Sequence, residues 1–223
     1  MPKITETSPQ KNNPRRFNIF LDGEFSFGAD EDLVVEYRLI PGKIIEQALL
    51  EKLLYEADVG KLMERMYRLF HIRQRSEKEV RDYLTSLSFK REIKGEDEIS
   101  SASIELVINK LKKKRLLSDG EFARSWVEAR RRSKKTGKLR LKQELFQKGI
   151  NKEIIEEVIN SYQDGDISID EEQLAQQALE KKWRVWKLLS DLEKKRKGYE
   201  FLMRRGFEYE VVKSVIEKLI RKE

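Results

Sequence analysis

Residues 118–149 read SDGEFARSWVEARRRSKKTGKLRLKQELFQKG, and this stretch decides the fold. It opens with Ser118, followed three residues later by Glu121, which is a capping-box signal for the start of a helix. It closes at Gly149, a residue type that commonly ends a helix in the left-handed conformation. Gly137 separates two helical patterns of apolar residues between these signals. The stretch therefore predicts a helix, a turn and a second helix, which together carry a dense run of Arg and Lys.

The same pattern returns later in the chain. Leu145 precedes Gly149 by four residues, and Leu202 precedes Gly206 by the same interval. An apolar residue follows each glycine, and a Val-Ile pair lies eight and nine residues beyond it. These equivalent positions are Ile150 with Val158 and Ile159, and Phe207 with Val215 and Ile216. The spacing indicates an internal repeat.

A third, degenerate copy precedes these two. Leu84 takes the leucine position, Ser88 replaces the glycine, Phe89 takes the apolar position, and Val107 with Ile108 forms the pair. A loop expected at 90–100 lengthens this copy.

Three copies predict a mainly α protein, built as an elongated, curved array of three tandem three-helix modules. A small N-terminal β-hairpin element precedes them. We expect the following division of the chain: a disordered tail at 1–14, a β-hairpin plus helix at 15–58, three-helix repeat 1 at 59–115, three-helix repeat 2 (basic) at 116–163, and three-helix repeat 3 at 164–223.

The hairpin is predicted from Asp22-Gly23, which lies between two short aromatic and β-branched runs. A type I′ turn needs positive φ at both central residues, and Asp-Gly supplies it. Residues 34–39 (VVEYRL) are expected to add a third strand. The tail is expected to be disordered because it is polar and carries three prolines.

Charge is distributed unevenly along the chain. The net charge is +7, but residues 110–148 carry 15 Lys or Arg against 4 Asp or Glu, a local net of +11. Residues 22–61 carry 10 acidic against 4 basic side chains, a local net of −6. The basic middle predicts an anionic partner, and we expect the middle module to be the only strongly charged one.

The sequence lacks the residues and motifs that several classes of function require. The chain has no cysteine and a single histidine, His71, which argues against thiol chemistry and against Cys- or His-ligated metal sites. No phosphate-binding or nucleophile-elbow motif occurs. We expect no catalytic residue, no metal and no cofactor. Because no apolar run is long enough to cross a membrane, we expect a cytoplasmic monomer.

The candidate contact residues for an anionic partner lie in the basic run. Glu128 is the only acidic residue between Arg124 and Arg140, so few pairs at i,i+4 can neutralise the run. A helical projection places Arg124 with Arg131 and Lys135 on one side, facing a polyanion, and Phe122, Trp126, Ala129 and Ser133 on the inward side. The alternative is an ordinary solvated helix face. The proposed contact set is Arg124, Arg130, Arg131, Arg132, Lys134, Lys135, Lys138, Arg140 and Lys142.

Three tryptophans allow two interpretations. Trp126, Trp183 and Trp186 could be platforms on which nucleic-acid bases stack. Their helical spacing with apolar neighbours favours a role in the core or between modules.

Two motifs resemble the RecX family of bacterial regulatory proteins. One is R-x-x-S-x-x-E-[VL]-x-x-x-L at 73–84. The other is the central unit, LLSDGEFARSWVEARRR at 116–132 followed by GKLRLxxELxxKGI at 137–150. The resemblance covers roughly residues 62–220, and some family members carry an N-terminal hairpin that would fit 17–40. Gly120, where the family commonly has an acidic residue, and the insertion at 90–100 are departures.

The resemblance implies a non-enzymatic modulator of the RecA recombinase in recombination, DNA repair and the SOS response. Family members dock into the groove of the RecA–single-stranded-DNA filament and suppress its ATPase, strand exchange or extension. Two alternatives remain from the residues themselves: a helical protein that binds DNA non-specifically, and a helical adaptor with no nucleic-acid role. Specific duplex readout is disfavoured because Asp119 and Glu121 would repel phosphates at the start of the central helix.

Overall fold

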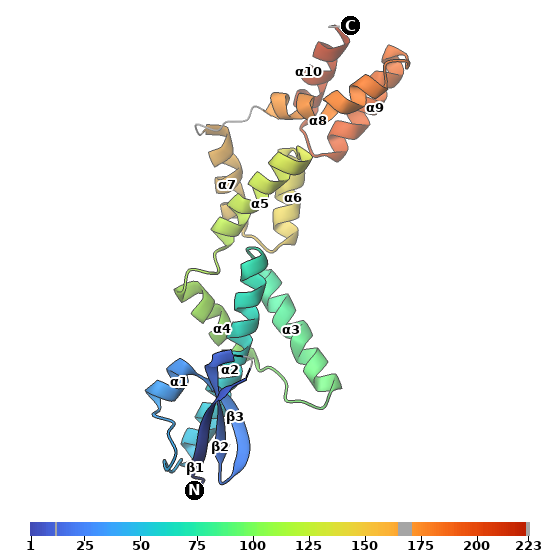
Figure 1. Ribbon diagram of the computed structural model, residues 1–223. Coiled ribbons are helices and arrows are strands. Elements are labelled where there is room, and N and C mark those ends of the chain that lie inside the picture. The colour runs from blue at the N-terminus through green and yellow to red at the C-terminus, as the bar shows by residue number, and fades with distance from the viewer. Residues whose placement is uncertain (12, 165–170, 222–223) are drawn as a thin grey trace. The chain divides into compact units, whose positions relative to one another are not determined.

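The computed structural model describes residues 1–11, 13–164 and 171–221, and it is mainly helical with one small sheet (Figure 1). The chain divides into two compact units. Unit 1 contains residues 1–73 and 84–116, and unit 2 contains residues 74–83 and 117–223.

The sheet of unit 1 is antiparallel, with strand order β1-β2-β3. Its strands are β1 (Ile4–Gln10), β2 (Asn13–Leu21) and β3 (Glu24–Asp30). The predicted turn between β2 and β3 is confirmed, because φ is 50° at Asp22 and 92° at Gly23, and Leu21 pairs with Glu24.

The prediction of a disordered tail at 1–14 is wrong. Residues 4–10 form the edge strand β1, which satisfies its backbone groups by pairing with β2. Ile4 anchors the strand in the core with an exposed fraction of 0%. Pro9 is compatible with this position because an edge strand tolerates a residue without an N–H. The polar composition concealed a strand whose order depends on its partner.

The expected third strand at 34–39 is also wrong. Helix α1 (Glu31–Glu36) begins there, because the Asp30 side chain accepts a hydrogen bond from the Leu33 amide at 2.9 Å. Two acidic residues in the first turn further favour the helix through its dipole. The core beneath the sheet contains Ile4, Ile19, Leu21, Phe27, Ala29, Leu33, Leu39, Ile45, Leu53 and Ala57.

Helix α2 (Gln47–Ile72) runs without interruption through the boundary expected between residues 58 and 59. The hairpin element and repeat 1 therefore share one continuous helix. Helix α2 packs against both β3 and α4 (Ser101–Lys113).

Repeat 1 differs from its prediction after Leu84. Helix α3 (Glu77–Ile93) continues past Ser88, so Phe89 is 62% exposed and does not take the apolar position. Ile99 takes it instead, at 5% exposure, and its amide donates to Ser88 Oγ at 2.9 Å. Ile99 precedes Val107 by eight residues, the interval found in the other two copies. The insertion therefore lies before the apolar position, as a longer helix and a shorter loop than expected.

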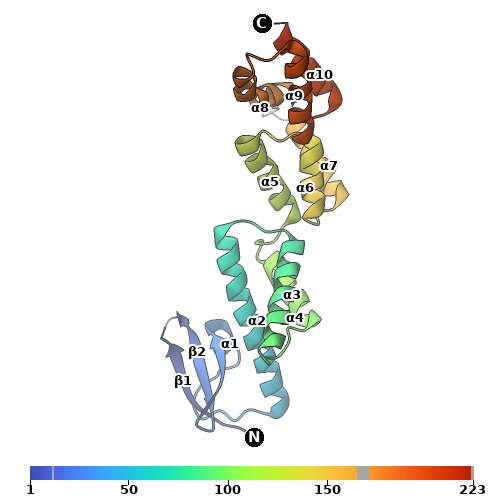
Figure 2. The ribbon, with the colours of Figure 1, turned by 90° about the vertical axis from the view of Figure 1, so that its right-hand side faces the viewer.

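Unit 2 contains two three-helix groups, whose helices are labelled α5 to α7 and α8 to α10 in Figure 2. The first group consists of α5 (Asp119–Lys134), α6 (Lys138–Gln147) and α7 (Lys152–Asp164). The second consists of α8 (Glu171–Val185), α9 (Asp191–Arg204) and α10 (Tyr209–Ile220). Within each group the helices pack pairwise.

The repeat equivalence is confirmed in unit 2. Gly149 and Gly206 adopt φ of 79° and 81°, the left-handed conformation that ends a helix. The apolar positions that follow them are all buried: Ile150, Val158 and Ile159 in one group, and Phe207, Val215 and Ile216 in the other. Leu145 and Leu202 are both fully buried in their group cores.

The N-terminal turn of α6 docks onto the turn between α9 and α10. The Gly137 amide donates to the Arg205 carbonyl at 2.9 Å, and the Leu139 amide donates to the Gly206 carbonyl at 3.0 Å. A Cβ on either glycine would overlap backbone atoms of the facing segment. Both glycines are therefore required for this close backbone approach.

The N-terminal turn of α3, which belongs to unit 2, contacts the turn between α6 and α7 through side chains. Ser76 Oγ donates to the Lys148 carbonyl at 2.8 Å, and Glu79 pairs with the Lys148 ammonium at 2.5 Å. A Cβ on Gly149 would overlap the Lys78 side chain. The two junctions thus share one placement, in which a helix N-terminal turn faces the C-terminal turn of another helix, whose last carbonyls need partners. Backbone amides make the contact at the α6 junction, and side chains make it at the α3 junction.

Candidate partner-binding surface

The central basic run, defined as residues 124–142, lies on α5, α6 and the turn between them. Its nine predicted contact residues do not share one exposed surface. Arg124, Arg132, Lys134 and Arg140 are exposed, Arg130, Lys135, Lys138 and Lys142 are half-buried, and Arg131 is buried.

The sequence predicted that few pairs at i,i+4 neutralise the run, but acidic residues at other spacings pair with it as well. Arg130 pairs with Glu144 at 2.7 Å, and Lys142 pairs with Glu156 on α7 at 2.6 Å. These partners are distant in sequence, so spacing rules for a single helix could not reveal them. The remaining pairs are Arg124–Glu121, Arg132–Glu128, Arg140–Glu144 and Lys138–Glu208. Within the described part of the chain, only Lys134 and Lys135 of the nine have a side chain without an ion pair or hydrogen bond.

Arg131 corrects the helical projection. Its side chain is 3% exposed and pairs with Glu171 of α8 at 3.0 Å, so it faces inward. Ala129 and Ser133, assigned to the inward side, are exposed. Burial raises the pKa of Glu171, and the nearby Arg131 charge only partly offsets that increase. Arg131 therefore ties the two three-helix groups together and is removed from the partner-binding surface.

Trp126 is a packing residue with one polar edge. Its ring stacks on Phe122 with centroids 5.6 Å apart, and its Nε1 donates to Glu144 at 3.0 Å. The Arg130 guanidinium lies 4.4 Å from the ring centroid, and the Lys148 ammonium lies 5.2 Å from it. The ring is thus covered by the chain's own cations, which leaves little of its face for a nucleic-acid base.

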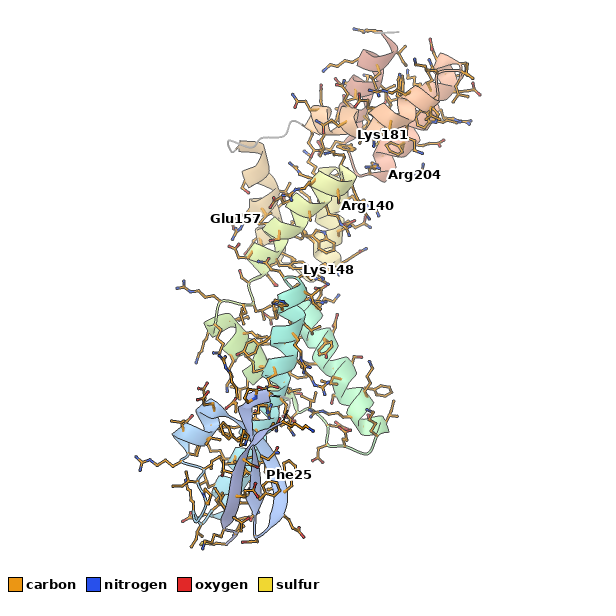
Figure 3. The ribbon with its side chains drawn as sticks, viewed as in Figure 1. Phe25, Arg140, Lys148, Glu157, Lys181 and Arg204 are labelled. Atoms are coloured by element: carbon orange, nitrogen blue, oxygen red, sulfur yellow. The ribbon has the colours of Figure 1, made fainter. Side chains whose placement is uncertain are left out.

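The Glu144 carboxylate accepts hydrogen bonds from both Trp126 and Arg130. Burial alone would raise its pKa, but hydrogen bonds from Trp126 and Arg130, with the Arg130 charge, hold the pKa below its ordinary value. Arg140 adds a weaker contact at 3.3 Å. Figure 3 shows Arg140 and Lys148 at the two ends of α6, with Glu144 between them in sequence.

The other two tryptophans also belong to the core, as predicted. Trp183 is 6% exposed within the core of the second three-helix group. Trp186 packs partly against that core, in edge contact with Trp183 and Phe201.

A second basic segment was missed by the expectation that only the middle module is strongly charged. Residues 181–197 carry eight Lys or Arg against two acidic residues, a net charge of +6. We call this segment, at the connection between α8 and α9, the C-terminal basic corner. Counting charged residues in a sliding window along the sequence is enough to find this segment.

The described residues also bear on two other kinds of site. Across residues 1–11, 13–164 and 171–221, no three His, Asp or Glu side chains lie close enough to share a metal ion. Over the same ranges, no helix has the length and apolar character needed to cross a membrane.

Three family models match the chain. The model described as "Regulatory protein RecX N-terminal domain" matches residues 2–46. Those described as "RecX, second three-helix domain" and "RecX, third three-helix domain" match residues 118–159 and 170–216.

Similar proteins extend over nearly the whole chain. "Regulatory protein RecX" of Bacillus pumilus is 34% identical over 218 residues, which are 98% of this chain and 78% of the relative. The Bacillus subtilis protein of the same description is 32% identical over 219 residues, with the same coverage.

Two solved structures are also similar. One is described as "Crystal structure of regulatory protein RecX" and has a TM-score of 0.71 at 22% identity. The match covers 97% of this chain and 100% of that one. At this level of identity, the likeness is evidence for the fold only. "Crystal structure of RecX from Lactobacillus salivarius" has a TM-score of 0.59 at 26% identity, and the match covers 73% of this chain and 96% of that one.

Proposed function

This chain belongs to the RecX family of regulatory proteins, and from that premise we propose that it regulates the RecA recombinase. The proposed action is binding to the RecA–single-stranded-DNA filament and inhibition of its ATPase, strand exchange or extension. The chain acts by binding and not by catalysis. The single observation that carries the proposal is similarity over 98% of the chain to proteins described as regulatory protein RecX.

The module architecture supports this function physically. Successive helix groups in unit 2 are joined by backbone hydrogen bonds at glycines that admit no side chain, so their relative placement is constrained. A chain of constrained modules can engage several sites on a repetitive partner at once. Several weak contacts then add to one strong attachment. Attachment across protomers opposes the motions that hydrolysis and strand exchange require.

The charge distribution narrows the proposed contact set. A cation already used inside the protein contributes less to a partner, because breaking its internal pair offsets the gain. The proposed contacts of the central basic run are therefore Arg132 and Lys134, which are exposed, and the half-buried Lys135. Arg130, Arg131 and Lys142 hold the module together instead.

The test is a double charge reversal, Arg132→Glu with Lys134→Glu, assayed by RecA-driven ATP hydrolysis on single-stranded DNA. Both side chains are exposed, so the fold should survive and the concentration for half-inhibition should rise roughly tenfold, as expected for the loss of about 1–2 kcal/mol of electrostatic attraction. Lys152→Glu with Lys213→Glu is the matched control, since both lysines are exposed in unit 2 and the change in charge is equal.

Binding to the filament, to free RecA and to bare single-stranded DNA should be compared in the same buffers over a range of salt. Preference for the filament supports the proposal. Equal affinity for bare DNA would favour the non-specific DNA-binding alternative, and no binding to any of the three would favour the adaptor alternative.

A further inference from the structure

Three aliphatic side chains project from the connection between α8 and α9. Val185 is 76% exposed, Leu188 is 100% exposed and Leu192 is 78% exposed. All three fall within eight residues of sequence, from the last residue of α8 to the first turn of α9. Exposed aliphatic side chains cost solvation free energy, and apolar patches on a surface commonly mark interaction sites.

Cations surround these side chains, and they differ in pairing from the central basic run. Arg184 and Arg196 pair only with Glu180 and Glu200, one helical turn away on exposed surface. Such exposed pairs hold a charge weakly. Lys194 is buried and pairs with Asp191 at 3.8 Å. The residues that the structure describes supply no ion pair or hydrogen bond to the side chains of four other lysines: Lys181, Lys182, Lys187 and Lys195. Figure 3 shows Lys181 projecting from α8.

The repeat equivalence shows what the neighbouring face of α9 does in other modules. Ser76 and Gly137 lie eight residues before Leu84 and Leu145, and each begins the helix turn that docks onto the next module. The equivalent residue in the last repeat is Lys194, eight residues before Leu202. The equivalent turn thus makes a contact between modules twice within this chain.

Among the residues that the structure describes, no backbone hydrogen bond joins the N-terminal turn of α9 to another module. Helix α9 begins one turn earlier than its counterparts relative to Leu202, and Ser190 with Glu193 forms a complete capping box there. The helix therefore satisfies its own N-terminal amides. Lys195 and Arg196, which follow the docking position, are exposed. The docking position Lys194 is itself buried and pairs with Asp191. The exposed part of this turn is therefore formed by the side chains that follow Lys194.

We propose that the C-terminal basic corner is a docking surface for an acidic protein surface that contains an apolar groove. Leu188, Leu192 and Val185 enter the groove, and Lys181, Lys182, Lys187 and Lys195 pair with carboxylates at its rim. An apolar centre with a charged rim is the usual anatomy of a protein–protein interface. The inference rests on the proposed function, so the partner presenting this surface is RecA in its filament.

A protein partner fits better than a nucleic acid or a lipid surface. Aliphatic side chains cannot stack on bases as aromatic ones do, and Trp186 is occupied by Trp183 and Phe201. A membrane-surface helix requires a long apolar face, whereas α9 is strongly polar along its length.

The decisive variant is Leu188→Ser with Leu192→Ser, measured for binding to filaments assembled on immobilised single-stranded DNA. Both side chains are exposed, so folding is preserved, and circular dichroism with urea denaturation verifies this. We expect at least a tenfold loss of affinity. The control is Phe89→Ser with Ile93→Ser on α3, where two apolar residues are similarly exposed, and its affinity should stay within twofold of wild type.

A second variant tests the rim. Lys187→Glu with Lys195→Glu should weaken filament binding at least fivefold and reduce its dependence on salt, because fewer ion pairs form. Lys152→Glu with Lys213→Glu again controls for net charge.

The outcomes separate this inference from the proposed function. If wild type binds the filament and both corner variants bind equally well, the docking surface is wrong and the proposed function stands. If wild type does not bind the filament, both fail. If the serine variant loses affinity for bare single-stranded DNA, or for vesicles of anionic lipid, as strongly as for the filament, the corner recognises phosphates and the inference is overturned.

Discussion

The central basic run and the C-terminal basic corner look alike in sequence and differ in structure. The first has nine basic residues against one acidic residue over 124–142, and the second has eight against two over 181–197. In the central run, acidic residues from α6, α7, α8 and the start of α10 return to pair with the cations. In the corner, the pairs Arg184–Glu180, Lys194–Asp191 and Arg196–Glu200 each join neighbours along one helix.

The difference shows that basic residues clustered in sequence can serve two roles: internal ion pairing that stabilises the fold, or exposed charge that can bind a partner. Arg131, buried against Glu171, serves cohesion between helix groups, whereas Lys187, exposed and without an ion pair to any described residue, remains for a partner. Removing a cation that forms an ion pair inside the protein should lower the free energy of unfolding. Removing an exposed, unpaired cation should lower the affinity for a partner. The following predictions test this division.

The largest effect is expected for Arg131→Ala. It leaves the Glu171 carboxylate buried without its guanidinium, and breaking a buried pair in this way costs about 3–5 kcal/mol of unfolding free energy. Urea denaturation measures it, with Arg132→Ala as the control on the exposed side of the same helix, expected to cost less than about 0.5 kcal/mol.

The same comparison has a pH signature. Loss of Arg131 should raise the pKa of Glu171 further above its ordinary value. A carboxyl whose folded-state pKa is raised favours the fold at low pH, so the deficit of Arg131→Ala should shrink as the pH falls through that raised pKa. Equal losses for Arg131→Ala and Arg132→Ala would show that the central run is not divided as described.

An intermediate effect is expected for Glu144→Gln, which removes the charge that Arg130 and Trp126 contact. Hydrogen bonds to a charged group suggest a loss on the order of 1–3 kcal/mol near neutral pH. The folded-state pKa of Glu144 lies below its ordinary value, so its stabilisation is present above that value and is lost as pH falls through the folded-state pKa. The gap between wild type and variant should therefore close below about pH 4, the ordinary range of a glutamate. A gap that persists unchanged at acidic pH would contradict this assignment.

The smallest effect on stability is expected for Lys187→Ala in the corner, within about 0.5 kcal/mol of wild type by the same urea assay. Filament affinity should fall measurably in this variant, because Lys187 belongs to the proposed rim. A large loss of stability would mean that Lys187, like Arg131, is committed inside the protein.

Sequence alone determined the modules of this protein. The left-handed glycines at 149 and 206, the leucine four residues before each, and the Val-Ile pair after each are local signals, and the structure confirms all of them. The Asp22-Gly23 turn was predicted for the same reason, because turn chemistry depends on adjacent residues. Family membership also follows from such motifs.

Only the tertiary structure decided what depends on partners distant in sequence. Strand β1 exists because β2 lies beside it, and Ile99 replaces Phe89 in the core because α3 continues past Ser88. The direction of Arg131 was likewise set by Glu171, forty residues away. The physical reason is common to these cases. Periodicity records which face of a segment is apolar, but pairing free energy depends on which groups the fold brings within a few ångströms.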